Sequence, residues 1–180
     1  MDTPPRWFIG LMSGTSLDGV DGVLAHFSGQ KCTVAQHASA PLAPNLRAEL
    51  LALNSTGHDE LHRAALAANA LARTYAKVVH RLLDQAGLTA AAVQALGAHG
   101  QTVRHRPQAF DGTGYTLQLN QPALLAEITG ITVVADFRSR DVAAGGHGGA
   151  LVPALHPGGV RPARGPVAVA KLGGVSHPST

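Results

Sequence analysis

The feature that most constrains the fold is a long amphipathic helix in the middle of the chain. Its apolar side chains recur at spacings of three and four residues, at Leu61, Ala65, Ala68, Leu71, Tyr75, Val78 and Leu82. This period places them on one face of a helix that packs on a core. Gly87 is suited to end the helix, because glycine accepts the left-handed backbone of a C-cap.

Short apolar runs on both sides of this helix predict strands. Two runs enclose the turn-forming segment 13–19, as in a β-hairpin, and the run 131–135 has the β-branched character of a strand buried in the centre of a sheet. The expected strands are 7–12, 20–27, 32–39, 95–97, 115–119 and 131–135, with short helices at 46–53 and 122–128. This order predicts an α/β domain with a mixed sheet and flanking helices.

Composition narrows the function classes. With 180 residues and 45% hydrophobic residues, the chain is long enough for a domain with a real core. Its apolar runs are too short to span a bilayer, it lacks a secretory signal, and Cys32 is its single cysteine, so we expect a cytoplasmic protein without a membrane partner. Its 14 Lys and Arg residues are scattered and aromatic residues are few, which argues against binding to nucleic acid.

The first candidate motif is the hairpin connection. Gly14 and Gly19 allow backbone amides to approach an oxyanion, the Thr15 and Ser16 hydroxyls add donors, and Asp18 or Asp21 could hold Mg²⁺ through water. These residues therefore suggest a phosphate cradle. An ordinary turn stays open as an alternative, because the same residue types fill most connections.

The second motif, residues 97–105, follows a short strand, where polar side chains often face a ligand. His99, Gln101 and Arg104 are suited to holding a sugar, although a single histidine is more often structural. The third motif, residues 135–150, combines two carboxylates, two arginines and a run of glycines. Here the alternative is two solvated surface pairs, Asp136 with Arg138 and Arg140 with Asp141.

Three strings in this order resemble the bacterial anhydro-N-acetylmuramic acid kinases: residues 8–21, 97–102 and 136–146. The resemblance implies a two-lobed actin-like ATPase (ribonuclease H-like) fold, with ATP, Mg²⁺ and the sugar in the cleft between the lobes. It also implies transfer of a phosphoryl group to 1,6-anhydro-N-acetylmuramic acid while water opens the anhydro ring. The product is N-acetylmuramic acid 6-phosphate, formed in cell-wall recycling and amino-sugar catabolism.

The same resemblance implies roles for individual residues. ATP would be bound by Gly14, Thr15, Ser16, Leu17, Asp18, Gly19, Val20 and Asp21, and the sugar by His99, Gln101 and Arg140, with Asp136 and Asp141 shaping the cleft. Two departures from the family pattern, His147 in place of Gln and Gly149 in place of Ala, bear on the fit of the substrate. A homodimer is a further possibility.

The division of the chain follows from the same comparison. We expect an amino-terminal lobe at 1–157, a Gly- and Pro-rich linker at 158–166 and the start of a second lobe at 167–180, with the rest of that lobe missing. The catalytic base would lie beyond Thr180, with Asp136 as the fallback, so the chain alone is expected to be inactive. The strand 167–170 would lack a partner and promote self-association.

Two other functions stay open. The first is a non-catalytic lobe that binds a sugar or a nucleotide without turnover. The second is hydrolysis by Ser16, His99 and Asp136, or metal binding by His99, His105 and His147. It ranks low because the chain has neither a G-x-S-x-G elbow nor an H-E-x-x-H helix.

Overall fold

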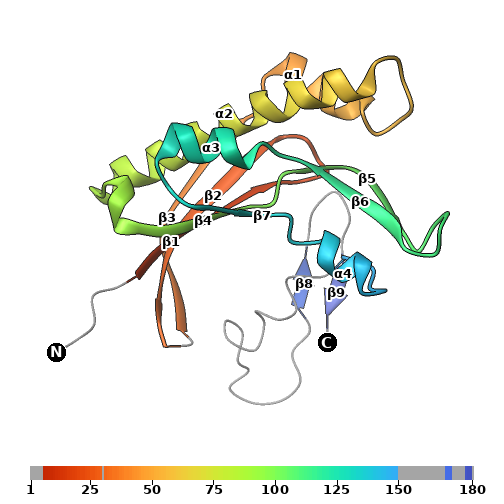
Figure 1. Cartoon of the computed structure of the whole chain (residues 1–180). Coiled ribbons are helices and arrows are strands. Elements are labelled where there is room, and N and C mark those ends of the chain that lie inside the picture. The colour runs from red at the N-terminus through yellow and green to blue at the C-terminus, as the bar shows by residue number, and fades with distance from the viewer. Residues whose placement is uncertain (1–5, 30, 150–168, 172–176, 180) are drawn as a thin grey trace.

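A five-stranded sheet forms the centre of the computed structural model, which describes residues 6–29, 31–149, 169–171 and 177–179. The strands lie in the order β3-β2-β1-β4-β7 (Figure 1). Their bounds are β1 Arg6–Ser13, β2 Gly19–Ser28, β3 Lys31–Pro41, β4 Val93–Ala98 and β7 Val133–Ala135. The hairpin β1–β2 and the strand β3 are therefore formed where the sequence predicts them.

The sheet is mixed, as predicted. β1 pairs with β2, and β2 with β3, in antiparallel fashion, while β1 pairs with β4, and β4 with β7, in parallel. A chain that returns to pair in parallel needs a long crossover. The segment with α1 (Pro44–Ala52) and α2 (Glu60–Ala86) supplies it, leading from β3 past β2 and β1 to β4, the parallel neighbour of β1. Helix α3 (Pro122–Thr129) precedes β7.

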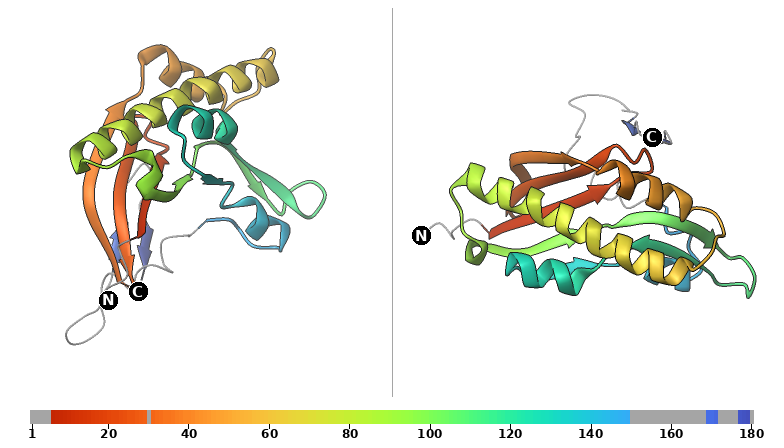
Figure 2. Two further views of the ribbon diagram at one scale, coloured as in Figure 1. Left: turned by 60° about the vertical axis from the view of Figure 1, so that its left-hand side comes forward. Right: turned by 90° about the horizontal axis from the view of Figure 1, so that it is seen from above.

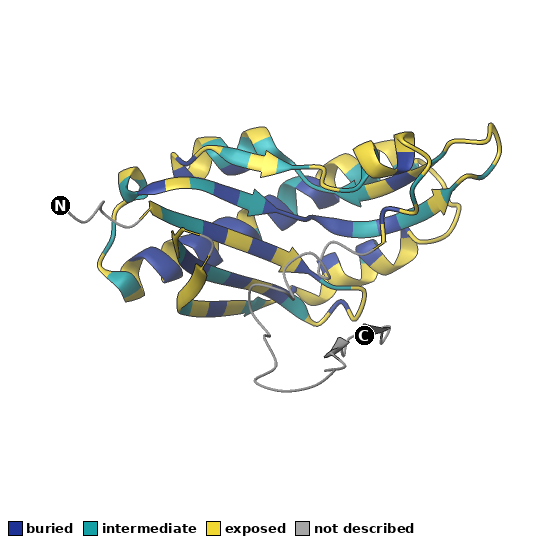
Figure 3. Cartoon of the chain, turned by 90° about the horizontal axis from the view of Figure 1, so that it is seen from below, coloured by how far each residue is buried: buried dark blue, intermediate teal, exposed yellow. Residues whose placement is uncertain are grey.

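The core lies between the sheet and the helices α2 and α3, which cover the same face (Figure 2). Along β1 the side chains of Ile9 and Leu11 are buried on this face, whereas the alternate residues Gly10 and Met12 are exposed on the opposite face. This alternation is visible from the side away from α2 (Figure 3). Gly22 lets α2 pack closely, because a Cβ atom there would lie 2.5 Å from Val78 Cγ1.

The helix stripe is confirmed in part. Ala68, Leu71, Tyr75, Val78 and Leu82 are buried, and Gly87 ends α2 in the left-handed conformation (φ 63°). The prediction is wrong at Leu61 and Ala65, which are exposed. A helix of 27 residues is about 40 Å long, and its first turns lie beside α1, where Arg63 pairs with Glu49 at 2.7 Å.

Three elements differ from the sequence prediction. Strand β5 (Gln101–Pro107) pairs with the predicted β6 (Gly114–Leu119) in a separate hairpin, and α4 (Ser139–Ala143) was also not foreseen. Strand β5 was missed because its sequence is mostly polar and lacks an apolar run. Gln101 and Val103 are the only buried residues of this strand. The expectation of a central strand at 131–135 is wrong, because β7 is an edge of the described sheet and Val134 is half exposed.

The expectation of an unpartnered strand near the end of the chain is also wrong. Strand β8 (Val169–Lys171) pairs in antiparallel fashion with β9 (His177–Ser179). This pairing satisfies the backbone groups of β8 on the side that faces β9. The predicted linker at 158–166, and with it the domain boundary, lies outside the described residues. Among the described helices, none is both long and apolar enough to cross a membrane.

Candidate functional site

The three sequence motifs converge at one end of the sheet, where the strands that carry them terminate. Strands β1, β4 and β7 are parallel neighbours, so their carboxyl ends lie at the same end of the sheet. The loop 14–18 leaves β1 there, His99 follows β4, and Asp136 follows β7. Ligands of open α/β sheets commonly bind beyond the carboxyl ends of the strands. We call these three segments the strand-end site.

The loop 14–18 is a tight turn. The Leu17 amide donates a 3.1 Å hydrogen bond to the Gly14 carbonyl, and Leu17 has a left-handed backbone (φ 55°). The side chains of Leu17 and Val20 are buried in the core, so among the predicted ATP-binding residues these two can offer a ligand only their backbone. The exposed hydroxyls belong to Thr15 and Ser16.

The two glycines of this loop differ in their environment. A Cβ atom at Gly19 would lie 2.7 Å from the Ala40 carbonyl oxygen, so packing against β3 is enough to require glycine there. At Gly14 the nearest atom to such a Cβ would be Ser16 Oγ at 3.5 Å, an ordinary contact, and φ is not positive. The described fold therefore does not require glycine at position 14, which fits a close approach by a ligand.

The acidic residues of the motif face different surroundings. The Asp18 carboxylate accepts a 2.8 Å hydrogen bond from Ser16 Oγ, and this bond is the main reason why the pKa of Asp18 is lowered. Asp21 lies in β2 and its Oδ1 is 3.5 Å from His37 Nε2, with both side chains exposed. Among the described residues, no three His, Cys, Asp or Glu side chains gather as a metal site.

A buried hydrogen bond connects the first and second motifs. Ser13 Oγ, at the end of β1, donates to Gln101 Oε1 at 2.6 Å, and Gln101 is only 1% exposed. Beside it, the Gly100 amide donates to the Tyr75 hydroxyl at 3.1 Å. Helix α2 thus holds the second motif against the strand that carries the loop 14–18.

The second motif is joined to the third through His99. Arg138 Nε donates to His99 Nε2 at 2.8 Å, so this ring nitrogen is the acceptor. The proton then resides on Nδ1, which donates to the Gly100 carbonyl at 2.8 Å. His99 is buried, at 8% exposure, and the hydrogen bonds at its two ring nitrogens fix the orientation of the ring.

Arg138 is the residue that the sequence argument missed. Its Nη1 donates to the carbonyls of Gly148 and Gly149, the latter at 3.0 Å, and this holds the glycine-rich segment against His99. The idea of a solvated pair with Asp136 is wrong, because Arg138 is half-buried and burial lowers its pKa. Its place inside the family motif was the one signal available from the sequence.

The remaining residues of the third motif shape the chain locally. Asp136 Oδ1 accepts a 2.5 Å hydrogen bond from Ser139 Oγ at the start of α4. Asp141 Oδ2 accepts one of 2.7 Å from the Gly148 amide, which closes the turn after α4. Among the ion pairs of the described residues, none joins Asp141 to Arg140, whose side chain is exposed. From the turn that connects β5 and β6, Gln108 Nε2 donates to the Gly145 carbonyl at 2.8 Å.

The geometry does not form a hydrolytic triad. Ser16, His99 and Asp136 bond to Asp18, Arg138 and Ser139, respectively, and not to one another. Nor does it bring together the three histidines proposed for a metal. His99 bonds to Arg138, while His105 Nδ1 lies 3.0 Å from Thr116 Oγ1 on the β5–β6 hairpin.

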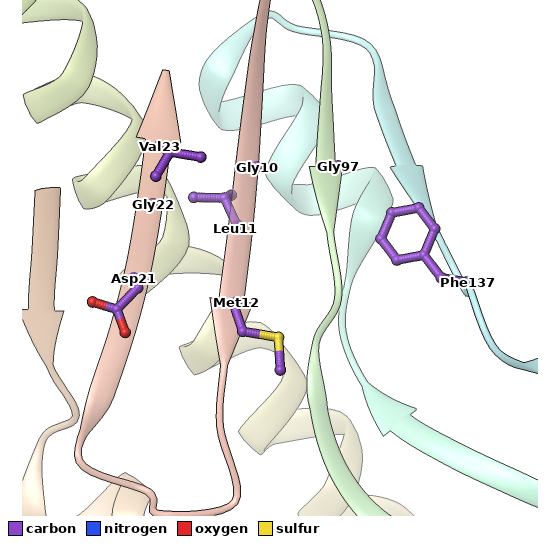
Figure 4. A pocket seen from close by; sticks show the side chains of 8 residues that line it. All are labelled: Gly10, Leu11, Met12, Asp21, Gly22, Val23, Gly97 and Phe137. Atoms are coloured by element: carbon purple, nitrogen blue, oxygen red, sulfur yellow. The ribbon is translucent and has the colours of Figure 1, made fainter. Parts of the chain in front are cut away.

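A shallow hollow of about 340 Å³ lies on the sheet face opposite α2 (Figure 4). Its lining is mostly apolar and consists of Gly10, Leu11, Met12, Asp21, Gly22, Val23, Gly97 and Phe137. The Phe137 ring lies over Gly97, where a Cβ atom would be 3.2 Å from Cζ. The hollow borders the strand-end site and shares only Asp21 with the predicted site residues.

Comparison with known proteins gives one consistent family. Residues 6–180 match the family described as anhydro-N-acetylmuramic acid kinase. A protein of that name from Albidiferax ferrireducens is 65% identical over 94% of this chain and 44% of its own length. Its counterpart in Bordetella petrii is 62% identical over 98% of this chain and 46% of its own length. The chain thus spans less than half the length of these curated relatives.

Proposed function

Since this chain belongs to the anhydro-N-acetylmuramic acid kinase family, we propose that it forms the phosphate-cradling and sugar-binding part of an ATP-dependent sugar kinase. The family has the actin-like ATPase fold, and the five-stranded mixed sheet with its helices is a ribonuclease H-like lobe of that fold. The reaction would convert 1,6-anhydro-N-acetylmuramic acid to N-acetylmuramic acid 6-phosphate. ATP would be the phosphoryl donor. The reaction would take place in the cytoplasm.

The observation that carries the proposal is the convergence of the three motifs at the strand-end site. Phosphoryl transfer depends mainly on positioning and on stabilisation of charge, so the groups that hold phosphate and sugar must share one rigid frame. The buried bond between Ser13 and Gln101 and the bond between His99 and Arg138 supply such a frame. They connect segments that are far apart in the sequence.

We assign the ATP phosphates to the loop 14–18. Its open Gly14, its exposed hydroxyls at Thr15 and Ser16 and the amides of the turn are the groups that such an anion requires. Mg²⁺ would neutralise the phosphate charge. The exposed carboxylate of Asp18, held in its ionised form by Ser16, fits a water-mediated contact with that ion.

We assign the sugar to the part of the strand-end site that follows β4 and β7, near His99 and the segment 145–149. Gln101 and Arg140 stay predictions for this role, with Gln101 buried and Arg140 exposed. The base that activates the ring-opening water is expected in the part of the family that this chain does not span. Asp136 remains the fallback, although its carboxylate is already bonded to Ser139.

A non-catalytic binding lobe is the competing function. To separate the two, we would fuse residues 1–180 to the carboxy-terminal remainder of the Albidiferax ferrireducens relative. The chimera would be incubated with ATP, Mg²⁺ and the anhydro sugar, and the sugar 6-phosphate sought by mass spectrometry. Our proposal predicts ATP-dependent product from the chimera and none from the 180 residues alone. A folded chimera that binds the sugar without turnover would favour the competing function. Light scattering of the same samples would test for a homodimer.

A further inference from the structure

The guanidinium group of Arg138 is charged, half-buried and without a carboxylate partner among the described residues. The ion pairs among the described residues involve Arg63, Arg104 and His37, and not Arg138. The sequence supplies no Asp or Glu side chain after Asp141, so the undescribed residues from 150 onward offer none, and Asp2 is the one acidic side chain among the other undescribed residues, 1–5 and 30. A desolvated cation without a counter-ion is costly, and such groups usually have an anionic partner.

Three of its donors fix the guanidinium in place. Nε is bonded to His99, and Nη1 is bonded to the carbonyls of Gly148 and Gly149. These acceptors are all uncharged: His99 is neutral because its Nε2 accepts, and the other two are backbone carbonyls. Among the described residues none accepts a hydrogen bond from Nη2, and none of their buried nitrogens or oxygens lacks a partner. Nη2 is therefore accessible from outside the protein.

We propose that Arg138 recognises the carboxylate of the acidic sugar through Nη2, so that this residue selects sugar acids over uncharged sugars. The inference rests on the proposed function and adds the specificity-determining residue to it. Arginine suits this role, because it stays charged and its planar group is already oriented by the three bonds. Burial of the guanidinium strengthens its attraction for an anion by reducing the screening of its charge.

The carboxylate of the sugar fits the position of Arg138 better than a phosphate of the nucleotide does. Arg138 follows β7, whereas the loop 14–18 follows β1, and β4 lies between these strands. Neighbouring strands are about 4.8 Å apart, so two steps across the sheet separate the two positions by roughly 10 Å. An anion at Arg138 therefore lies beside the phosphate loop rather than within it.

The test compares the anhydro sugar acid with its carboxamide, an uncharged analogue of the same shape, as substrates of the chimera. We expect the KM of the amide to exceed that of the acid by about tenfold or more, as for loss of a charged hydrogen bond. Arg138→Gln should raise the KM of the acid by a similar factor and leave the KM of the amide within about threefold. Arg138→Lys should retain part of the preference.

Arg73→Gln is the matched control, because it removes the same charge from the exposed face of α2 and should leave the preference intact. Equal KM values for acid and amide in the parent chimera would overturn the inference even if the Arg138 variants failed to fold. So would a rise in the KM of both sugars in Arg138→Gln, which would mean that Arg138 only positions His99. A rise in the KM of ATP alone would assign Arg138 to the nucleotide. Turnover of neither sugar would refute the proposed function itself.

Discussion

The Ser13 hydroxyl donates a 2.6 Å hydrogen bond to the side-chain carbonyl of Gln101, 88 residues further along the chain. Both side chains are buried, at 2% and 1% exposure. Ser13 is the last residue of β1, directly before the loop 14–18, and Gln101 is the first residue of β5. The loop and the second motif are thus parts of one rigid unit.

A double-mutant cycle should detect this bond. Gln101→Met removes the acceptor and leaves the buried Ser13 hydroxyl unsatisfied, so we expect a loss of about 1–3 kcal/mol in the free energy of unfolding. With Ser13→Ala already present, the same change should cost less, because no hydroxyl is then stranded. Urea unfolding of the four proteins gives the coupling. Additivity within about 0.5 kcal/mol would show that the two side chains do not interact.

Two glycine substitutions should separate function from packing. Gly14→Ala places a Cβ atom where the described protein leaves room, so stability should change little, whereas turnover of the chimera should fall at least tenfold if ATP phosphate lies there. Gly22→Ala brings Cβ to 2.5 Å from Val78 Cγ1 and should cost about 1–3 kcal/mol of stability. Thermal unfolding and steady-state kinetics measure the two effects. If Gly14→Ala keeps turnover within about threefold, the loop does not bind phosphate.

Tyr75→Phe tests how α2 supports the second motif. The Tyr75 hydroxyl accepts a hydrogen bond from the buried Gly100 amide, and its removal leaves that amide without a partner. We expect a loss of about 1–3 kcal/mol in the free energy of unfolding. Tyr115→Phe, on the exposed β5–β6 hairpin, is the control and should cost far less. Equal costs for the two substitutions would mean that the Gly100 contact is not formed in solution.

The charge of Asp18 should depend on Ser16. The hydrogen bond from Ser16 lowers the pKa of Asp18, so its stabilising effect is present above the ordinary pKa of Asp, about 3.9, and is lost as the pH falls through the lowered value. Ser16→Ala should therefore raise the pKa of Asp18 toward its ordinary value. An NMR titration of the Asp18 carboxyl carbon measures this change. An unchanged pKa in the variant would exclude the bond as its cause.

How far the sequence predicts this molecule depends on the range of the interaction. The β1–β2 hairpin and α2 are encoded by local periodicity, and Gly87 ends α2 as expected. Leu61 was assigned to the core because periodicity does not reveal how far a helix extends past its sheet. Arg138 could not be recognised, because its partner His99 lies 39 residues away and becomes a neighbour only when β4 and β7 pair.

One NMR titration tests the central claim most directly, namely that nucleotide and sugar meet at the strand-end site. The 18.4 kDa chain is small enough for its backbone amides to be resolved, and ATP with Mg²⁺ and the anhydro sugar would be added in turn. We predict that ATP shifts the amides of residues 14–19 and that the sugar shifts His99, Arg138 and residues 145–149. Shifts confined to the hollow around Gly10, Val23 and Phe137, or no shifts with either ligand, would contradict the account.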